Sequence, residues 1–119
     1  MKRLIVANWK MNPPNKKTAK KIFDSAQKNA CGLKNIEVVV CPPFVYLGVL
    51  SLSASGGFRA KSHSAFGAQD VFWDEKKTSY TGEISATMLK NLGVKYVIIG
   101  HSERREHLGE DNLIINKKV

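Results

Sequence analysis

The chain has 119 residues, 43% of them hydrophobic and 24% charged, which is the composition of one ordinary globular domain and excludes disordered and fibrous classes. Its apolar runs fall far short of the ~20 residues that cross a bilayer, so we expect no membrane span. The N-terminal apolar stretch is too short for a signal-peptide core, which makes a cytoplasmic location the default expectation.

The net charge of +9 raises nucleic acid or a phosphorylated ligand as possible partners. The lysines at the start of the chain, however, fall between apolar positions of one segment, as on a solvated helix face, and no aromatic residues interleave them to stack on bases. We therefore expect no nucleic-acid partner. The two cysteines, Cys31 and Cys41, have no histidine pair at metal spacing, which predicts reduced, structural thiols and no metal site.

The first elements along the chain are a strand and a helix. Residues 3–7 (RLIVA) form a continuous apolar run, typical of a strand buried on both faces of a parallel sheet. Residues Lys16–Ala30 carry apolar side chains at helical spacing, preceded by two prolines and followed by Gly32. This pattern predicts an amphipathic helix.

The middle of the chain repeats the pattern. Residues Ile36–Cys41 (IEVVVC) read as a second buried strand that ends at two prolines. Residues 44–54 are apolar and end in Ser55-Gly56-Gly57, which favours a short helix. A third strand is expected over residues 62–68, and the irregular residues 71–82 predict a long loop.

The last third predicts a helix over residues 83–92, a fourth buried strand over residues 96–100 (YVIIG), and another helix opening over residues 108–119. Strands that begin near residues 3, 36, 62 and 95 with helices between them indicate right-handed βαβ units. The predicted fold class is therefore α/β with a parallel sheet.

Polar clusters follow the first and fourth strands, at the sheet edge where parallel α/β folds bind ligands. Asn8 and Lys10 lie two residues apart and can project to the same side to grip an anionic, carbonyl-bearing ligand. His101 stands where a helix can start, with Ser102 and Glu103 after it, and the positive end of the helix dipole disfavours a charged imidazole. A neutral imidazole can donate a hydrogen bond to a carbonyl oxygen. The alternative is that Lys10 is merely solvated and His101 a surface residue.

Five motifs in order, VANWKMN, CPPF, GAQDVFW, YTGEIS and VIIGHSERRE, resemble the triose-phosphate isomerase family across nearly the whole chain. The resemblance implies a parallel (β/α)8 TIM barrel, of which residues 1–119 are the N-terminal half of a single domain with about four strands. It also implies an aldose-ketose isomerase of glycolysis and gluconeogenesis that interconverts dihydroxyacetone phosphate and glyceraldehyde 3-phosphate through an enediolate. No metal and no organic cofactor are implied.

The resemblance assigns roles to the clustered residues. Asn8 and Lys10 contact the substrate, and Lys10 offsets the phosphate and the developing oxyanion charge. His101 is the electrophile that polarises the carbonyl and shuttles a proton between the two oxygens. Ser102 holds the catalytic glutamate in its resting position, and Glu103 pairs with Lys10.

The family forms homodimers in which the long third loop, here residues 71–82, plugs into the neighbouring subunit. Thr81 is expected to reach Asn8 and His101 of the partner subunit, and Glu83 and Arg104 resemble an intersubunit ion pair. The alternative for the loop aromatics is that they cover their own sheet. The expected interface residues are Met11, Phe72, Trp73, Tyr80, Thr81, Glu83 and Arg104.

A complete (β/α)8 barrel needs roughly 250 residues. The family's glutamate base, its lid loop and its Gly-rich phosphate loops have no counterpart in this sequence, so we expect the isolated chain to be inactive. Three hypotheses follow: a partial triose-phosphate isomerase, a non-catalytic half-barrel that pairs with a complementary half or with itself, and, least favoured, a module that binds polyanions through its positive charge.

Overall fold

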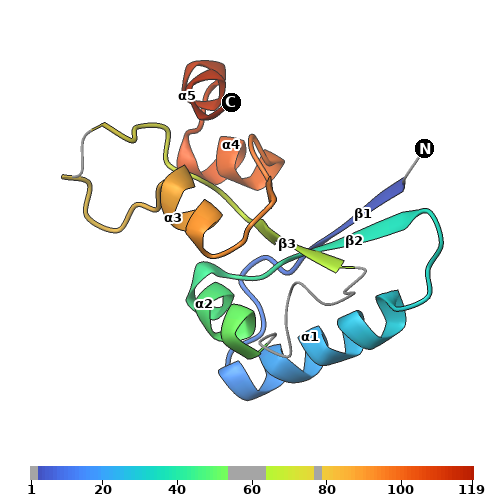
Figure 1. Ribbon diagram of the computed structural model, residues 1–119. Coiled ribbons are helices and arrows are strands. Elements are labelled where there is room, and N and C mark those ends of the chain that lie inside the picture. Colours follow the sequence, from blue (N-terminus) through green and yellow to red (C-terminus); the bar gives the residue numbers. More distant parts are fainter. Residues whose placement is uncertain (1–2, 54–63, 77–78) are drawn as a thin grey trace.

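A parallel sheet of four strands organises the chain (Figure 1). A computed structural model describes residues 3–53, 64–76 and 79–119, and in these ranges the strand order is β1-β2-β3-β4, with every neighbouring pair parallel. The strands are β1 (Arg3–Asn8), β2 (Ile36–Cys41), β3 (Ser64–Ala68) and β4 (Tyr96–Val97). Residues 62 and 63 of the expected third strand lie outside the described residues. The fourth strand is shorter than expected: it ends at Val97, and after the Ile98 N–H bonds to the Ala68 carbonyl at 2.9 Å the chain turns toward the next helix.

Helices connect the strands, as the alternating pattern predicts. They are α1 (Lys16–Ala30), α2 (Phe44–Ser53), α3 (Ala86–Asn91), α4 (Ser102–Leu108) and α5 (Asn112–Lys118). Figure 1 shows α1 and α2 together on one side, whereas α3, α4 and α5 gather beyond the end of β3 around a long projecting loop. The sheet curls, and the chain has the fold of a partial parallel α/β barrel.

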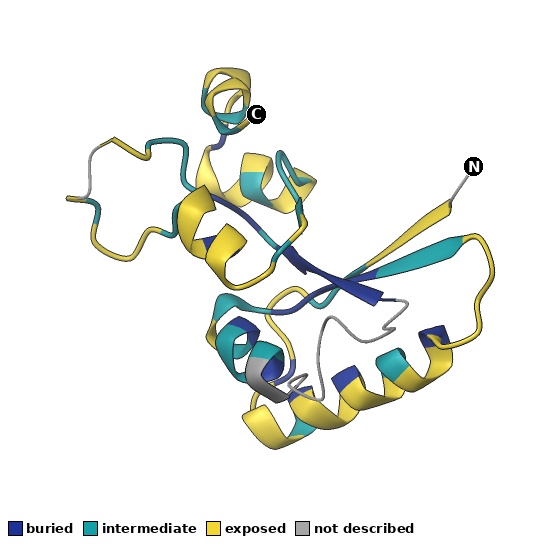
Figure 2. Cartoon of the chain, in the orientation of Figure 1, coloured by how far each residue is buried: buried dark blue, intermediate teal, exposed yellow. Residues whose placement is uncertain are grey.

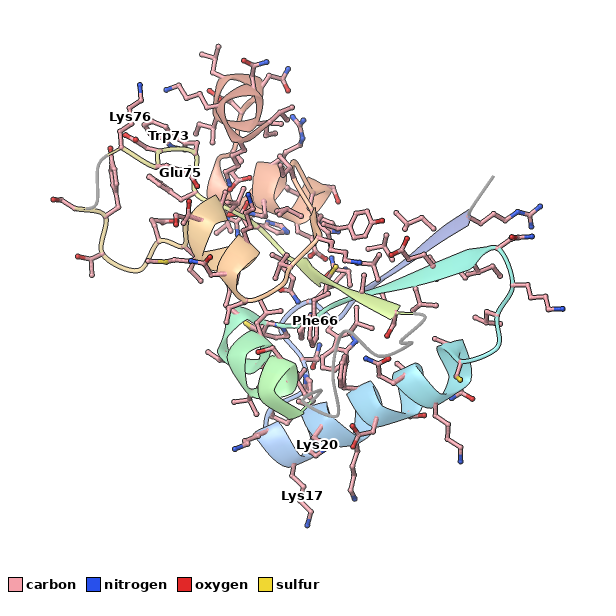
Figure 3. All side chains as sticks on the ribbon, in the orientation of Figure 1. Lys17, Lys20, Phe66, Trp73, Glu75 and Lys76 are labelled. Atoms are coloured by element: carbon pink, nitrogen blue, oxygen red, sulfur yellow. The ribbon has the colours of Figure 1, made fainter. Side chains whose placement is uncertain are left out.

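The local sequence of α1 accounts for the start of this helix and for its buried face. The Asn15 side chain accepts a hydrogen bond from the Thr18 N–H at 2.9 Å and caps the first turn. Ala19, Phe23 and Ala30 are buried on one stripe, and the remaining faces are exposed (Figure 2). Lysines cover the solvent side, as Lys17 and Lys20 illustrate in Figure 3.

Two helical segments differ from the sequence-based expectation. The expected helix over residues 83–92 begins only at Ala86, because the Ser85 hydroxyl accepts from the Met88 N–H at 3.2 Å and so acts as the N-cap. The expected helix over residues 108–119 is α5, and it begins only at Asn112, because the residues before it end α4 and cap α5. Gly109 adopts a left-handed φ of 68° and ends α4, and Asp111 accepts from the Ile114 N–H at 2.8 Å to start α5.

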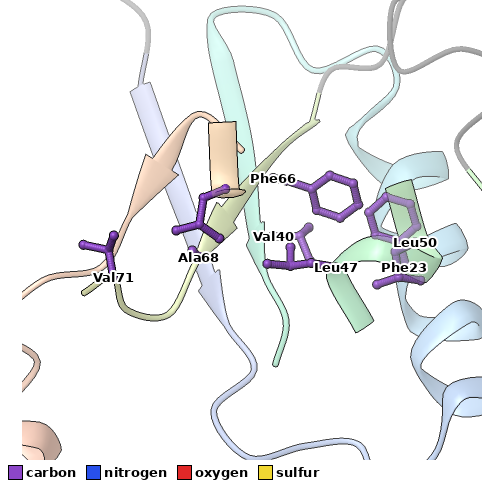
Figure 4. Packing of buried hydrophobic residues seen from close by; sticks show 8 residues of the cluster. Phe23, Val40, Leu47, Leu50, Phe66, Ala68 and Val71 are labelled. Carbon is purple, nitrogen blue, oxygen red and sulfur yellow. The ribbon is translucent and has the colours of Figure 1, made fainter. Parts of the chain in front are cut away.

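The main core lies between the sheet and the helices on one of its faces. Phe23 of α1 stacks on Phe66 of β3 with ring centroids 4.9 Å apart, and Leu47 and Leu50 of α2 pack beside them (Figure 4). Full burial of one such aliphatic side chain stabilises the fold by about 1.5–3 kcal/mol. This cluster holds β2 and β3 rigidly, and it therefore fixes the direction in which their carboxyl ends point.

The opposite face of the sheet is only partly covered. Val39, Cys41 and Ala65 are buried there, with Tyr96 and Ile98 packed against them. Val6 of β1 is paired with Val39 of β2 and lies on the same face of the sheet, yet Val6 is 46% exposed. The concave side of the curled sheet is therefore sealed over β2 and β3 and open toward β1.

Candidate active site

The carboxyl end of β1 presents Asn8 and Lys10 through a tight turn. The Asn8 Oδ1 atom accepts a hydrogen bond from the Lys10 N–H at 2.9 Å, and the Trp9 N–H donates to the Cys41 carbonyl at 3.1 Å. Lys10 has a φ of 54°, in the left-handed region that residues with a side chain rarely adopt. This backbone conformation turns the Lys10 side chain back over the end of the sheet.

His101 is the N-cap residue of α4. Its Nδ1 atom accepts a hydrogen bond from the Glu103 N–H at 3.2 Å. Because Nδ1 is an acceptor, the proton of the neutral imidazole resides on Nε2. The helix start therefore orients the ring and leaves an N–H donor for a ligand.

Glu103 joins the two strand ends. One carboxylate oxygen contacts the Lys10 Nζ atom, and the other lies 3.7 Å from His101 Nδ1. The hydrogen bond from Lys10 holds the pKa of the Glu103 carboxyl below its usual range. The lysine ammonium is thus kept over the cavity by a carboxylate at the start of α4.

An open cavity of about 580 Å³ lies between these groups. Strands β1 and β4 are at opposite edges of the described sheet. Their ends nevertheless meet at one cavity, because the sheet curls. Ser102, at the first position of α4, is exposed and is not among the lining residues. The lining residues are Asn8, Lys10, Met11, Asn12, Gln69, His101, Glu103, Arg104, His107 and Leu108.

The cavity brings together residues that sequence reasoning predicted and some that it missed. Asn8, Lys10, His101 and Glu103 were predicted from their strand ends. Gln69 was not, although it stands in the GAQD motif directly after β3, at the same sheet edge as Asn8. That position was the available signal.

Arg104 has partners within its own chain. Its guanidinium lies 2.8 Å from Asp70 and 2.7 Å from Glu110, and Lys118 approaches both carboxylates at 2.6 Å. Burial opposes charge on Glu110, but the hydrogen bonds from Arg104 and Lys118 outweigh it and lower the pKa of the carboxyl. The ion pair that the resemblance implies between Glu83 and Arg104 across a subunit interface stays a prediction. Within the chain, burial opposes the charge of the Arg104 guanidinium, but the hydrogen bond to Glu110 and the charges of Asp70, Glu110 and Glu83 outweigh it and raise the pKa of this group.

The aromatic residues of the loop after β3 pack on one another. The Phe72 ring lies 5.2 Å from Trp73 and 4.5 Å from Tyr80, centroid to centroid, and the Lys117 ammonium sits 4.4 Å above the Trp73 ring. Figure 3 shows Trp73 on the projecting loop, away from the sheet. Thr81 is exposed and Met11 is 94% exposed. The contacts of the loop aromatics shown here are thus with one another and with Lys117.

In the part of the chain that the structure describes, the groups needed for thiol or metal chemistry are not assembled. Cys41 is buried, and burial raises the pKa of its thiol to about 11, so the thiol stays neutral. Across the described residues, His, Cys, Asp and Glu side chains nowhere cluster in threes or more to hold a metal ion. Within the same ranges, no helix has the length and apolar character needed to span a bilayer.

Fold and cavity together define a protein of the parallel α/β barrel class with a polar site at the carboxyl ends of its strands. Comparison with known proteins gives the particular family. The family model for triosephosphate isomerase matches residues 3–119, and the chain belongs to this family.

Similar curated proteins carry the same name. The chain is 48% identical over 120 residues to a triosephosphate isomerase of Thermoanaerobacter sp. strain X514, 43% identical over 120 residues to that of Moorella thermoacetica, and 41% identical over 119 residues to that of Aquifex aeolicus. Each alignment covers 100% of this chain and 45% of the relative. The chain thus spans a little under half the length of the curated relatives it matches.

Proposed function

We propose that this chain supplies the N-terminal half of a single (β/α)8 barrel domain that interconverts dihydroxyacetone phosphate and glyceraldehyde 3-phosphate in the cytoplasm. The observation that carries the proposal is the shared cavity of Lys10 and His101, which come from opposite edges of the sheet. The names of the relatives agree with it. The reaction moves protons between neighbouring atoms, so it needs no redox cofactor.

The geometry suits each charge change of this isomerisation. A base from outside the chain removes a proton from the carbon next to the carbonyl, and the electron pair moves onto the carbonyl oxygen to form the enediolate. The His101 Nε2–H donates to that oxygen, and the Lys10 ammonium stabilises the negative charge as it develops. His101 gives its Nε2 proton to that oxygen and takes the proton of the hydroxyl on the neighbouring carbon. The neighbouring oxygen then forms the new carbonyl as the base delivers its proton to the former carbonyl carbon, which completes the exchange of aldehyde and ketone.

Asn8 and Lys10 also serve substrate binding in this proposal. A phosphate dianion and a carbonyl on one small molecule match an ammonium and an amide that sit two residues apart. The contact with Glu103 keeps the Lys10 ammonium in place when the cavity is empty. When substrate binds, its phosphate competes with Glu103 for this ammonium. Ser102 is exposed at the start of α4, and we assign it to hold the base of the other half in its resting position.

An isomerase assay of separate halves tests the proposal. The 119-residue chain alone is expected to give no turnover, because the base and the phosphate-binding loops are supplied by the other half. Mixing it with the C-terminal portion of the Thermoanaerobacter relative should produce isomerase activity, and this activity should reach its maximum at one C-terminal portion for each 119-residue chain. A mixture that forms a complex without turnover would contradict the proposal.

We further propose that the assembled protein is a homodimer built through residues 71–82. The support is the self-packed aromatic cluster of Phe72, Trp73 and Tyr80 on a loop that projects from the body (Figure 1). Thr81 then reaches Asn8 and His101 of the partner subunit, and Met11 and Glu83 line the contact. Arg104 and Glu83 form an ion pair across the interface in this proposal.

A non-catalytic half-barrel is the second candidate. Leu4, Ile5 and Val6 on the open edge strand β1 are 48%, 51% and 46% exposed. Such an edge pairs readily with another strand, either from a complementary half or from a second copy. Sedimentation analysis tests this candidate, which requires either a dimer or larger species of the isolated chain or a complex with a C-terminal half. A monodisperse monomer that also fails to bind a C-terminal half would rule it out.

A further inference from the structure

Gln69 bridges the ends of three strands at the candidate site. It directly follows β3, and its side-chain Nε2 atom donates to the Lys10 carbonyl at 2.9 Å and to the Cys41 carbonyl at 2.9 Å. Lys10 follows β1 and Cys41 ends β2. One amide group therefore connects all three carboxyl ends.

The orientation of this amide follows from its partners. Both acceptors are backbone carbonyl oxygens, so only the NH2 end of the amide can face them. Both N–H bonds of Nε2 are used, one for each carbonyl. The same Cys41 carbonyl also accepts from the Trp9 N–H at 3.1 Å, which binds the turn after β1 to β2 a second time.

These hydrogen bonds hold the Lys10 peptide from both sides. The Asn8 side chain accepts from the Lys10 N–H, and Gln69 donates to the Lys10 carbonyl. Lys10 has a φ of 54°, a backbone conformation that a residue with a side chain keeps only when its surroundings hold it. Gln69 is thus one of the two groups that keep Lys10 in the left-handed region.

We propose that Gln69 is a positioning residue, which acts through Lys10 by fixing the backbone from which the ammonium reaches the cavity. This inference rests on the proposed function, since it concerns the placement of the cation that stabilises the substrate's charge. Gln69 itself lines the cavity, but its amide donors are occupied by the two carbonyls. Without them, Lys10 relaxes toward an ordinary backbone conformation and its ammonium leaves the position opposite the reacting oxygens.

Two nearly isosteric variants and one control test the proposal in the assembled protein. Gln69→Met keeps the volume and removes both donors. We expect kcat/KM for triose phosphate to fall on the order of 10²-fold, the scale of a misplacement of about 1 Å, with both a higher KM and a lower kcat. Gln27→Met is the control, because Gln27 lies on α1 and accepts from Ser64 away from the cavity. Its rate should equal that of the unsubstituted protein.

Gln69→Glu adds a readout that a purely structural role does not move. An ionised carboxylate places oxygen against two carbonyl oxygens, whereas the protonated form regains one donor. The ratio of the Gln69→Glu rate to the unsubstituted rate should therefore rise as the pH is lowered, while the ratio for Gln69→Met stays level. Equal pH dependence of the two ratios overturns the positioning role.

The outcomes separate this inference from the function on which it depends. An unsubstituted assembly without isomerase activity refutes the proposed function. An active assembly in which Gln69→Met retains its full kcat/KM refutes the role of Gln69 alone. Thermal unfolding of each variant is followed at every pH of the assay, so that the rates are compared per folded assembly. A loss of rate that disappears on this basis refutes the positioning role.

Discussion

The carboxylate of Glu103, in the first turn of α4, contacts the ammonium of Lys10, which follows β1. The two residues are 93 positions apart in sequence, so the contact closes the curl of the sheet across the strands between them. Both side chains are about half exposed, which screens the attraction. The pair therefore acts on the position of the ammonium more than on the stability of the fold.

Replacing Lys10 by methionine should raise the pKa of the Glu103 carboxyl toward the ordinary value of about 4.3. The shift follows because the hydrogen bond from Lys10 is the main cause of the lowered pKa. A depressed folded-state pKa means that the pair contributes stability above the unfolded-state pKa and loses it as the pH falls through the folded one. A carbon-13 NMR titration of the Glu103 side chain in the folded protein measures the change. The control Lys34→Met, at an exposed loop position, should leave the Glu103 pKa unchanged. An unchanged Glu103 pKa in Lys10→Met would contradict the pairing.

His101 is expected to act on the reaction separately from its capping of α4. Asparagine is among the best N-cap residues, so His101→Asn should keep the unfolding temperature while it removes the imidazole. In the assembled protein kcat should fall by about 10²–10⁴-fold, the usual contribution of a proton-transferring side chain. His101→Ala loses the cap as well and should be destabilised by about 0.5–2 kcal/mol. Steady-state kinetics and thermal unfolding of the two variants separate the roles, and a His101→Asn enzyme with the original kcat would disprove the chemical one.

The elements that sequence predicted best are those whose signal is local. The β-branched run of β2 and the apolar stripe of α1 need no distant partner to be recognised, and both have the expected bounds. The start of α5 was placed at residue 108 instead of Asn112, although Gly109 and Asp111 are good local signals for the end of one helix and the start of the next. Hydrophobic periodicity alone does not locate such a boundary.

The contacts that sequence could not predict depend on two features of the fold: the curl of the sheet, and the packing of the C-terminal helices against the ends of its strands. Gln69, after β3, meets Lys10, after β1, across the end of β2, and Arg104 meets Asp70 because α4 packs over the end of β3. Spacing along the chain carries no information about these distances. The motif resemblance says nothing of the contacts of Arg104 with the buried carboxylates of Asp70 and Glu110 within the chain.

Gly67 is required by close packing on the concave face of the sheet. A Cβ atom at this position would lie 2.4 Å from Cys41 Sγ and 2.8 Å from Val39 Cγ1, closer than real Cβ contacts. Gly67→Ala should therefore destabilise the folded protein by about 1–3 kcal/mol in denaturant unfolding, and less in a Cys41→Ala background that makes room. Gly48→Ala in α2 is the matched control, since nothing lies within 4 Å there and alanine should stabilise the helix by about 0.5–1 kcal/mol. Equal effects at the two glycines would show that the close contact is not limiting.

Two adjacent lysines of α5 provide the sharpest test of the ion cluster. The Lys118 side chain is 3% exposed and lies 2.6 Å from both Asp70 and Glu110, whereas Lys117 is at the surface, where it contacts the Trp73 ring. Lys118→Met leaves buried carboxylates short of a partner and should destabilise the fold by about 3–5 kcal/mol. Lys117→Met removes only a cation–π contact, worth about 0.5–1 kcal/mol at an exposed site.

The difference between these two variants should also depend on pH. Because the pKa of Glu110 is lowered in the folded protein, the contribution of its pairing is complete above the ordinary carboxyl pKa and decreases as the pH falls through the folded-state pKa. Denaturant unfolding of both variants at neutral and acidic pH should therefore show a gap that narrows in acid. A gap that is absent at neutral pH would mean that water replaces Lys118 without loss, and that the cluster does not hold α5 to the end of β3.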